Sequence, residues 1–316
     1  MKDYIYFIML IVATILMAVN FSFNKLYQKR KGTSPKAAFM FNSLFGLFTA
    51  TIYFVANGFK VDFSLYSLIM TTLFSICVMS YTVIGFKLLK TGTMAVYTLF
   101  LMVGGMVVPY IFGLIFLDEE FSVLRTIALI VILAGVVLAN YGGEKISKER
   151  LLMCIAVFLL NGMTSVLSKI HQIDIVTELE GFALPFAEMM GKDPEVIFRS
   201  VEKTDFVILG GIVRFVIAGV LFLLYSKKAE KEDGIKKAPL GILLLIIFGS
   251  AAVTGVSSIL QLEGASNLPA TVIYPVITGG TIIFSSISGM AFFKDKISYK
   301  TAISIFLCFV GTLMFL

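Results

Sequence analysis

Ten stretches of the chain are apolar over about 18 or more residues, and no other feature restricts its fold so strongly. A hydrocarbon core about 30 Å thick needs roughly 20 helical residues to cross it, so runs of this length are typical of transmembrane helices. With 58% hydrophobic and 15% charged residues, the chain also lacks the polar residues that would cover a soluble protein, in which about 25% are charged. We therefore predict an all-α polytopic membrane protein with ten transmembrane helices, at residues 4–24, 37–56, 65–86, 93–117, 123–141, 151–170, 205–226, 239–260, 268–292 and 299–316.

The first apolar run is expected to be a retained span and not a cleaved signal peptide. Asp3 offsets the charge of Lys2, the run exceeds 20 residues, and no A-x-A cleavage site precedes "NFSFNKLYQKRK". The cysteines, Cys77, Cys154 and Cys308, all lie within predicted spans, where free cysteine behaves as a small apolar residue. With His171 as the only histidine, we expect neither disulfides nor a metal site.

Basic residues are concentrated in alternate connections between the predicted spans. The connections after spans 1, 3, 5, 7 and 9 hold 18 of the 26 Lys and Arg residues, whereas the other side holds seven and Arg214 lies within a span. Because cytoplasmic loops carry the excess of positive charge, this bias places both termini outside the cytoplasm. The net charge of +6 is mostly this topological signal, so no nucleic-acid partner is inferred.

The connection 172–203 is the one long loop, and its charge is acidic. Asp193 followed by Pro194 is typical of a helix start, with an N-cap and a proline at the first helical position. We predict a short surface helix there. The loop is interpreted either as a solvated connector or as a lid.

The sequence repeats at a fixed offset. Residues 113–140 align without gaps onto residues 289–316, 176 positions later, and five pairs are identical: Gly113/Gly289, Phe116/Phe292, Ser122/Ser298, Ile127/Ile303 and Gly135/Gly311. Five spans per half is an odd number, so consecutive halves cross the membrane in opposite directions. We therefore predict two inverted repeats, 3–141 and 151–316, with 172–203 inserted in the second. Transporters with this plan bind substrate near the midplane between the halves.

Several short motifs resemble the drug/metabolite transporter superfamily, in its ten-helix form with two EamA-type repeats. They are "NFSFNK" (20–25), "NGMTSVLSK" (161–169), Arg214-Phe215 and "YPVITGGTIIFSSISGMAFFKDKIS" (274–298). The chain departs from that pattern in lacking tryptophan, in having Asn42 where the first repeat would carry arginine, and in its inserted loop. The resemblance implies transport by alternating access. It also implies cytoplasmic termini, against the charge bias.

Polar residues at helical spacing identify the candidate substrate path. Serine, threonine, tyrosine and glutamine recur every three or four residues through 250–261 and 271–288, so each set lies along one helix face. Such faces need a partner helix or a watery cavity, and both readings stay open for the hydroxyls. The candidate substrate-binding residues are Asn20, Asn24, Asn42, Tyr81, Tyr97, Asn161, Thr164, Arg214, Ser257, Gln261, Tyr274 and Thr278.

A second group of residues is a candidate for coupling or gating. Pro109 in one span, and Pro275 with Gly279 and Gly280 in another, can interrupt their helices, and such breaks are interpreted either as part of a binding site or as packing kinks without a ligand. Lys87 and Glu263 are separated by the repeat offset of 176, so a pair across the pseudo-axis is one reading and two ordinary interfacial residues the other.

Arg214 lies about ten residues inside an apolar span, where a charged side chain is rare and usually faces a cavity or a partner. The sequence leaves two roles open. The guanidinium either joins helices through backbone carbonyls, or holds the carboxylate or phosphate of a substrate with two parallel hydrogen bonds.

Together these features predict a secondary transporter of a small polar metabolite in the cytoplasmic membrane. The alternatives are an exporter of cationic compounds from the same superfamily and, less favoured, a channel. No set of two intramembrane aspartates, serine with histidine, or H-E-x-x-H is present, so we do not expect an enzyme, nor a cofactor. The expected partners are a small-molecule substrate and the lipid bilayer, with the chain a monomer or a homodimer.

Overall fold

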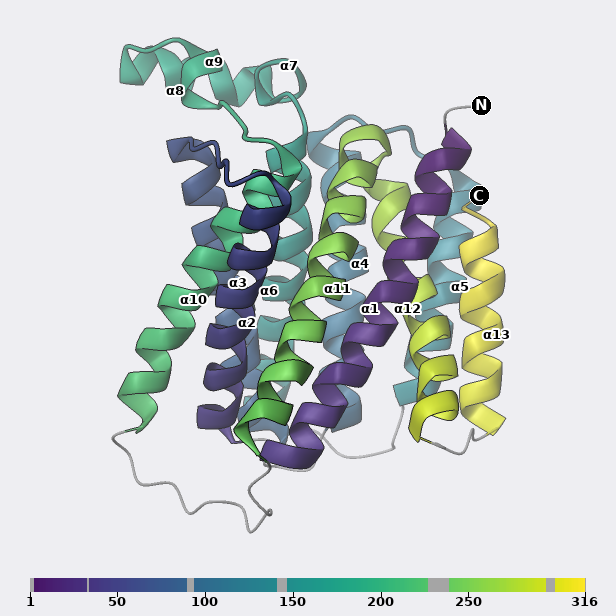
Figure 1. Cartoon of the computed structure of the whole chain (residues 1–316). Helices are drawn as coiled ribbons and strands as arrows, with labels where there is room; N and C mark the ends of the chain where they lie inside the picture. The colour runs from purple at the N-terminus through teal and green to yellow at the C-terminus, as the bar shows by residue number, and fades with distance from the viewer. Residues whose placement is uncertain are drawn as a thin grey trace.

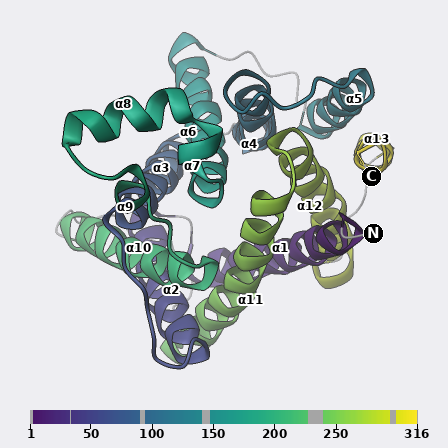
Figure 2. The same cartoon turned by 90° about the horizontal axis from the view of Figure 1, so that it is seen from above.

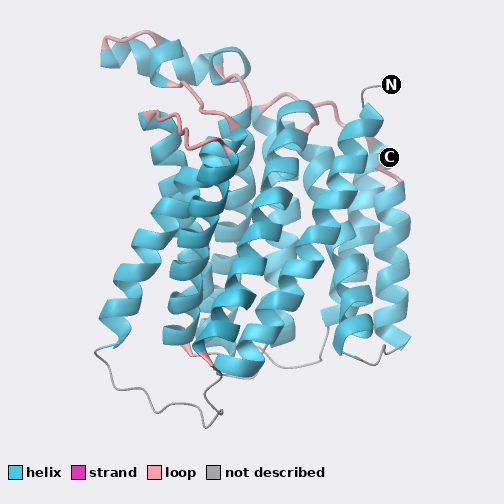
Figure 3. Cartoon of the chain, in the orientation of Figure 1, coloured by secondary structure: helices cyan, strands magenta, loops and turns pink. Residues whose placement is uncertain are grey.

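A computed structural model of the chain describes residues 3–32, 34–89, 94–140, 147–226, 239–293 and 299–315. The described residues form helices and no strands, which confirms the all-α prediction (Figure 1; Figure 3). The helices are α1 (Asp3–Lys31), α2 (Pro35–Ala56), α3 (Leu65–Leu89), α4 (Met94–Phe116), α5 (Val123–Asn140), α6 (Lys148–Gln172), α7 (Ile175–Glu178), α8 (Glu180–Met190), α9 (Pro194–Ile197), α10 (Lys203–Ser226), α11 (Leu240–Asn267), α12 (Ala270–Phe293) and α13 (Tyr299–Leu313).

Eight of the described helices are long and apolar enough to cross a membrane: α1, α2, α3, α4, α6, α10, α11 and α12. Two shorter apolar helices lie within α5 and α13, at Val123–Leu138 and Ala302–Leu313. The outer faces of the bundle are apolar as well, with exposed leucine, isoleucine, valine and phenylalanine side chains along α5, α10 and α13. These features are those of a multi-pass membrane protein.

The two ends of the bundle differ. One end, here called the cap end, carries both termini and the short helices α7, α8 and α9 (Figure 1). At the opposite end lie the last turns of α1, α3, α5, α10 and α12 (Figure 1), the helices that precede the basic connections of the sequence. The alternation of charge along the chain therefore corresponds to the two ends of the bundle.

The packing of the helices is reciprocal between the two halves of the chain. In the first half, α1 packs against α11 and α12; in the second, α6 packs against α3 and α4. Three further pairs join helices of the same rank in each half: α2 with α10, α4 with α12, and α5 with α13. Viewed from above, α2 with α10 and α5 with α13 lie at opposite edges of the bundle (Figure 2).

The crossing of α5 and α13 shows this reciprocity at the level of single residues. A Cβ on Gly135 would meet Ser304 and Cys308, at 3.0 Å from the carbonyl oxygen and 2.9 Å from Sγ. A Cβ on Gly311, its partner at the repeat offset, would meet the matching positions 128 and 132, at 2.9 and 2.6 Å. The two glycines therefore make reciprocal contacts where α5 and α13 cross.

The cap segment 173–202 is joined to the bundle through His171 at the end of α6. The Ser67 hydroxyl accepts hydrogen bonds from the backbone N–H of Val201 (3.0 Å) and from Ser64 (2.8 Å), and it is also hydrogen-bonded to His171 Nε2 (2.8 Å). Because the imidazole is fully buried and lies 4.0 Å from the Phe206 ring, this contact fixes where the cap segment meets α3 and α6.

The cap segment also contains the predicted short helix. Asp193 accepts a hydrogen bond from the N–H of Glu195 (3.0 Å) and starts α9, which confirms the N-cap reading. Near it, Arg199 binds Asp62 of the α2–α3 connection at 2.8 Å. The hydrogen bond from this guanidinium lowers the pKa of the Asp62 carboxyl below its usual value. The cap segment is therefore tied to the bundle at a second, exposed point.

Candidate functional site

Polar residues of α1 and α11 predicted from the sequence meet one another along the contact between these two helices. The side-chain oxygen of Asn20 accepts a hydrogen bond from the Ser250 hydroxyl (2.5 Å) and a longer one from the side-chain amide of Asn24 (3.5 Å). About two turns further along, Ser257 donates to the backbone carbonyl of Ala13 (2.8 Å). Gln261 donates to Ser257 (3.0 Å) and to the sulfur of Met17 (3.2 Å). These side chains hold α1 against α11.

The corresponding residues of the second half hold α6 against α4 and α12. Asn161 donates to the carbonyl of Leu101 (2.7 Å), and Tyr274 donates to the carbonyl of Ser165 (2.5 Å). Thr164 bonds only within its own helix, to the carbonyl of Asn161 (2.6 Å), and Thr278 is half-buried with no hydrogen-bond partner among the described residues. Most of the predicted polar residues therefore make the contacts that are expected of helix packing.

The predicted breaks at proline are absent: α4 runs through Pro109 and α12 runs through Pro275 without interruption. Proline deprives the carbonyl four residues earlier of its helical hydrogen bond, and membrane helices tolerate this where a neighbour supplies a donor. The Gly105 carbonyl, four residues before Pro109, accepts from the Ser165 hydroxyl of α6 (3.2 Å). A side chain from the adjacent helix thus replaces the lost donor.

Gly279 and Gly280 also act in packing. A Cβ on Gly279 would lie 2.2 Å from the Thr312 hydroxyl, and a Cβ on Gly280 would lie 3.0 Å from Thr14. The pair therefore lets α13 and α1 approach α12 closely from two sides.

Arg214 lies in the middle of α10 and faces α2. Its Nε donates to Asn42 Oδ1 (3.1 Å), and its Nη2 donates to the same oxygen. The Phe45 ring covers the guanidinium, with 4.3 Å between Cζ and the ring centroid. Asn42 is itself held by its hydrogen bond to the Ala38 carbonyl (2.8 Å). Among the described residues, no backbone carbonyl accepts from Arg214, so the predicted contact to carbonyls is not the one observed.

Of the remaining candidates, Tyr81 lies near Arg214. Tyr81 of α3 packs with Ala218 of α10, near enough to Arg214 for its hydroxyl to interact with that charge. The side chains of Tyr97 and Lys87 lie outside the described residues.

Glu263 pairs with Lys203 at 3.0 Å, at the cap end. Lys87 belongs to the last turn of α3, a helix that begins at the cap end and continues for about 30 Å at 1.5 Å per residue. The repeat offset therefore does not bring Lys87 and Glu263 together.

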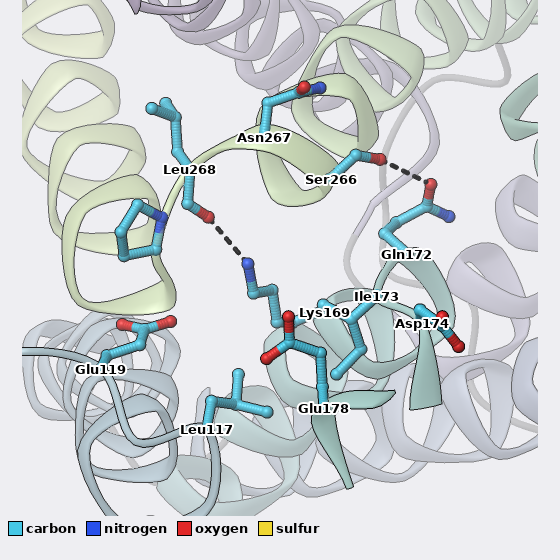
Figure 4. A pocket seen from close by; sticks show the side chains of 11 residues that line it. Leu117, Glu119, Lys169, Gln172, Ile173, Asp174, Glu178, Ser266, Asn267 and Leu268 are labelled. Carbon is cyan, nitrogen blue, oxygen red and sulfur yellow. Dashed lines mark hydrogen bonds between the residues drawn. The ribbon is translucent and has the colours of Figure 1, made fainter. Parts of the chain in front are cut away.

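A pocket of about 320 Å³ opens at the cap end, between the ends of α6 and α11, the start of α12 and the α4–α5 connection (Figure 4). Most of its lining side chains are polar or charged. The lining residues are Leu117, Glu119, Lys169, Gln172, Ile173, Asp174, Glu178, Ser266, Asn267, Leu268 and Pro269.

Opposite charges hold the corner between α11 and α12 at this pocket. The buried Lys169 ammonium donates to the backbone carbonyls of Ala265 (2.9 Å) and Leu268 (2.7 Å) at the end of α11. The Glu119 carboxylate accepts from the backbone N–H groups of Ala270 (2.5 Å) and Thr271 (2.8 Å) at the start of α12. A cation at a helix C-terminus and an anion at a helix N-terminus each interact favourably with the helix dipole. We call this arrangement the corner clamp.

Neither residue of the corner clamp was predicted as a site residue. Glu119 lies in the short connection between the fourth and fifth spans, and Lys169 lies three residues before the end of α6, where a lysine usually extends to the interface. In the sequence, the two residues are marked only by their position next to a predicted turn. Both bind the α11–α12 corner, which lies 96 to 152 residues away along the chain, and no local pattern predicts that contact.

Comparison with known proteins defines the fold and nothing finer. No protein-family model matches the sequence, and no curated protein matches it. A solved crystal structure of another protein is similar over 98% of this chain and 97% of its own, with a TM-score of 0.69 and 13% sequence identity. At that identity the similarity concerns the fold alone: this helical arrangement is one that a second, distantly similar chain also adopts.

Proposed function

We propose that the protein is a secondary transporter of the drug/metabolite transporter type, which moves a small polar metabolite across the cytoplasmic membrane between two inverted five-helix halves. The observation that carries this proposal is the reciprocal packing: α1 lies against α11 and α12, and α6 lies against α3 and α4. In this proposal, a two-fold axis in the membrane plane exchanges these two sets of contacts. Inverted halves of this kind are a recurring plan for alternating access around a midplane site.

The arrangement of polar groups supports the same path. Asn20 and Gln261 lie on one side of the bundle and Asn161 on the other, and all three keep partial exposure although they lie well inside their helices. Their described hydrogen bonds leave the Gln261 and Asn161 side-chain oxygens without a partner among the described residues. Amide oxygens are costly to bury unpaired, so in this proposal they face the substrate path.

Within this proposal, the corner clamp closes the path at the cap end. It joins α6 to the α11–α12 corner, and Ser266 adds a hydrogen bond to Gln172 of α6 (3.2 Å; Figure 4). Opening that end requires these contacts to break. Following the charge bias, we assign the cap end and both termini to the outside of the cell.

The test is a ligand screen followed by transport. Purified protein is screened by thermal shift against amino acids, sugars, nucleobases and cationic drugs, and each stabilising compound is then measured for uptake into proteoliposomes, beside protein-free liposomes. We expect a polar metabolite to stabilise the protein and to enter with saturable kinetics. If no stabilising compound is moved, with or without an ion gradient, the transporter proposal is wrong. If cationic drugs alone are moved, the exporter reading replaces it.

A further inference from the structure

The charge of Arg214 is not balanced by a carboxylate among the described residues around it. The surrounding helices α2 and α3 contain no aspartate or glutamate, and α10 contains one, Asp205. That residue lies nine positions away, about 13 Å along the helix, and is bound to Asn57 (3.0 Å). An unpaired charge at this depth is energetically unfavourable, and such residues usually have a partner or face a water-filled space.

The contacts of Arg214 leave part of its guanidinium available. A guanidinium has five N–H donors, and two of them are directed at Asn42 Oδ1. Because Asn42 is held by its bond to Ala38 and Phe45 covers one face, the plane of the guanidinium is fixed. The remaining donors have no acceptor among the described residues. A fixed fork of this kind matches the two oxygens of a carboxylate or a phosphate.

The Arg214 side chain is only half-buried, although it lies in the middle of α10. Its contacts to Asn42 and Phe45 both come from α2, so they cover the side chain from that helix and leave part of it accessible.

We propose that Arg214, oriented by Asn42 and Phe45, binds the anionic group of the transported substrate, so that the substrate class is small carboxylates or phosphate monoesters. The claim that the bound anion is a transported substrate rests on the proposed function, whereas the anion site itself does not depend on transport. Asn42 acts as a positioning residue, because its oxygen sets the direction of the guanidinium.

The test compares matched anionic and neutral probes on the purified protein. The probes are carboxylates of two to six carbons and phosphate monoesters, each beside its neutral amide or alcohol, with binding measured by thermal shift and calorimetry. We expect at least one anion, and not its neutral counterpart, to bind the wild-type protein. Arg214→Gln should weaken that binding at least tenfold, which is about 1.4 kcal/mol. Arg125→Gln, at the start of α5, is the control and should leave it unchanged.

A second variant separates binding from a structural role. Asn42→Asp places a carboxylate beside Arg214 and supplies the missing charge, so we expect it to fold at least as well as the wild type and to lose anion binding. It also decides the matter if Arg214→Gln does not fold. The inference is overturned if no anion binds in preference to its neutral counterpart, or if Asn42→Asp binds anions as well as the wild type. Anion binding without uptake in proteoliposomes would reject the transporter proposal and support the anion site. Uptake of an uncharged compound that does not need Arg214 would support the transporter proposal and reject Arg214 as the substrate-binding residue.

Discussion

Replacing Gly46 by leucine should abolish most of the folded protein. At the crossing of α2 and α10, a Cβ on Gly46 would lie 2.6 Å from the Gly211 carbonyl oxygen and 2.6 Å from the Phe215 nitrogen. Both are backbone atoms, so no side-chain rotation relieves the clash and the helices must separate. Small residues commonly allow membrane helices to pack this closely. Overpacking costs about 1–3 kcal/mol for added methylenes, and more where backbone must move.

The measurement is the yield of monodisperse protein and its melting temperature in detergent. Gly241→Leu is the matched control, because a Cβ at Gly241, in the first turn of α11, meets nothing within 4 Å. Gly211→Leu should behave as Gly46→Leu does, since its Cβ would lie 2.8 Å from the Ala50 nitrogen. A Gly46→Leu protein that melts with the control would show that α2 and α10 do not cross here.

Replacing Lys169 by methionine should loosen the α11–α12 corner. The change keeps the length of the side chain but leaves the Ala265 and Leu268 carbonyls without the donor that they now share. Hydrogen bonds to a charged group contribute about 1.5–3 kcal/mol each, and buried acceptors left unpaired add a penalty. We expect a loss of about 2–4 kcal/mol in stability and faster hydrogen exchange of the backbone amides at 265–272.

Lys203→Met serves as the control for this variant. Lys203 is also a paired lysine of the cap end, but its partner Glu263 is about a third exposed, and such ion pairs contribute about 0–1 kcal/mol. The comparison is made by melting temperature and by exchange measured with mass spectrometry. Equal effects of the two substitutions would contradict the corner clamp.

The sequence predicts the helices better than their ends. The first helix was expected to end near residue 24 but continues to Lys31, because the polar residues that follow favour helix as well and the chain turns only at Gly32, with φ of 91°. In the same way α11 runs to Asn267, where Pro269 follows. The length of an apolar run reflects the thickness of the hydrocarbon core, whereas the helix itself continues beyond the apolar run.

The cap segment was predicted only in part. Asp193 and Pro194 marked α9 correctly, since an N-cap and its proline are local signals. The longer helix α8 was missed, because the acidic residues of the loop suggested a solvated connector. The partners of Asn161, Tyr274 and Lys169 could not be predicted either: each donates to a backbone carbonyl 60 to 109 residues away, and only the assembled bundle brings those atoms together.

The most direct test of the inverted halves is the side of the membrane from which equivalent connections are labelled. Lys60→Cys lies in the connection between the second and third helices of the first half, and Lys231→Cys lies between the matching helices of the second. A membrane-impermeant maleimide should label Lys60→Cys in intact cells and Lys231→Cys only after permeabilisation. The wild type, with Cys154 and Cys308 buried and Cys77 half-buried, gives the background. Labelling of both positions from the same side would contradict the two inverted halves.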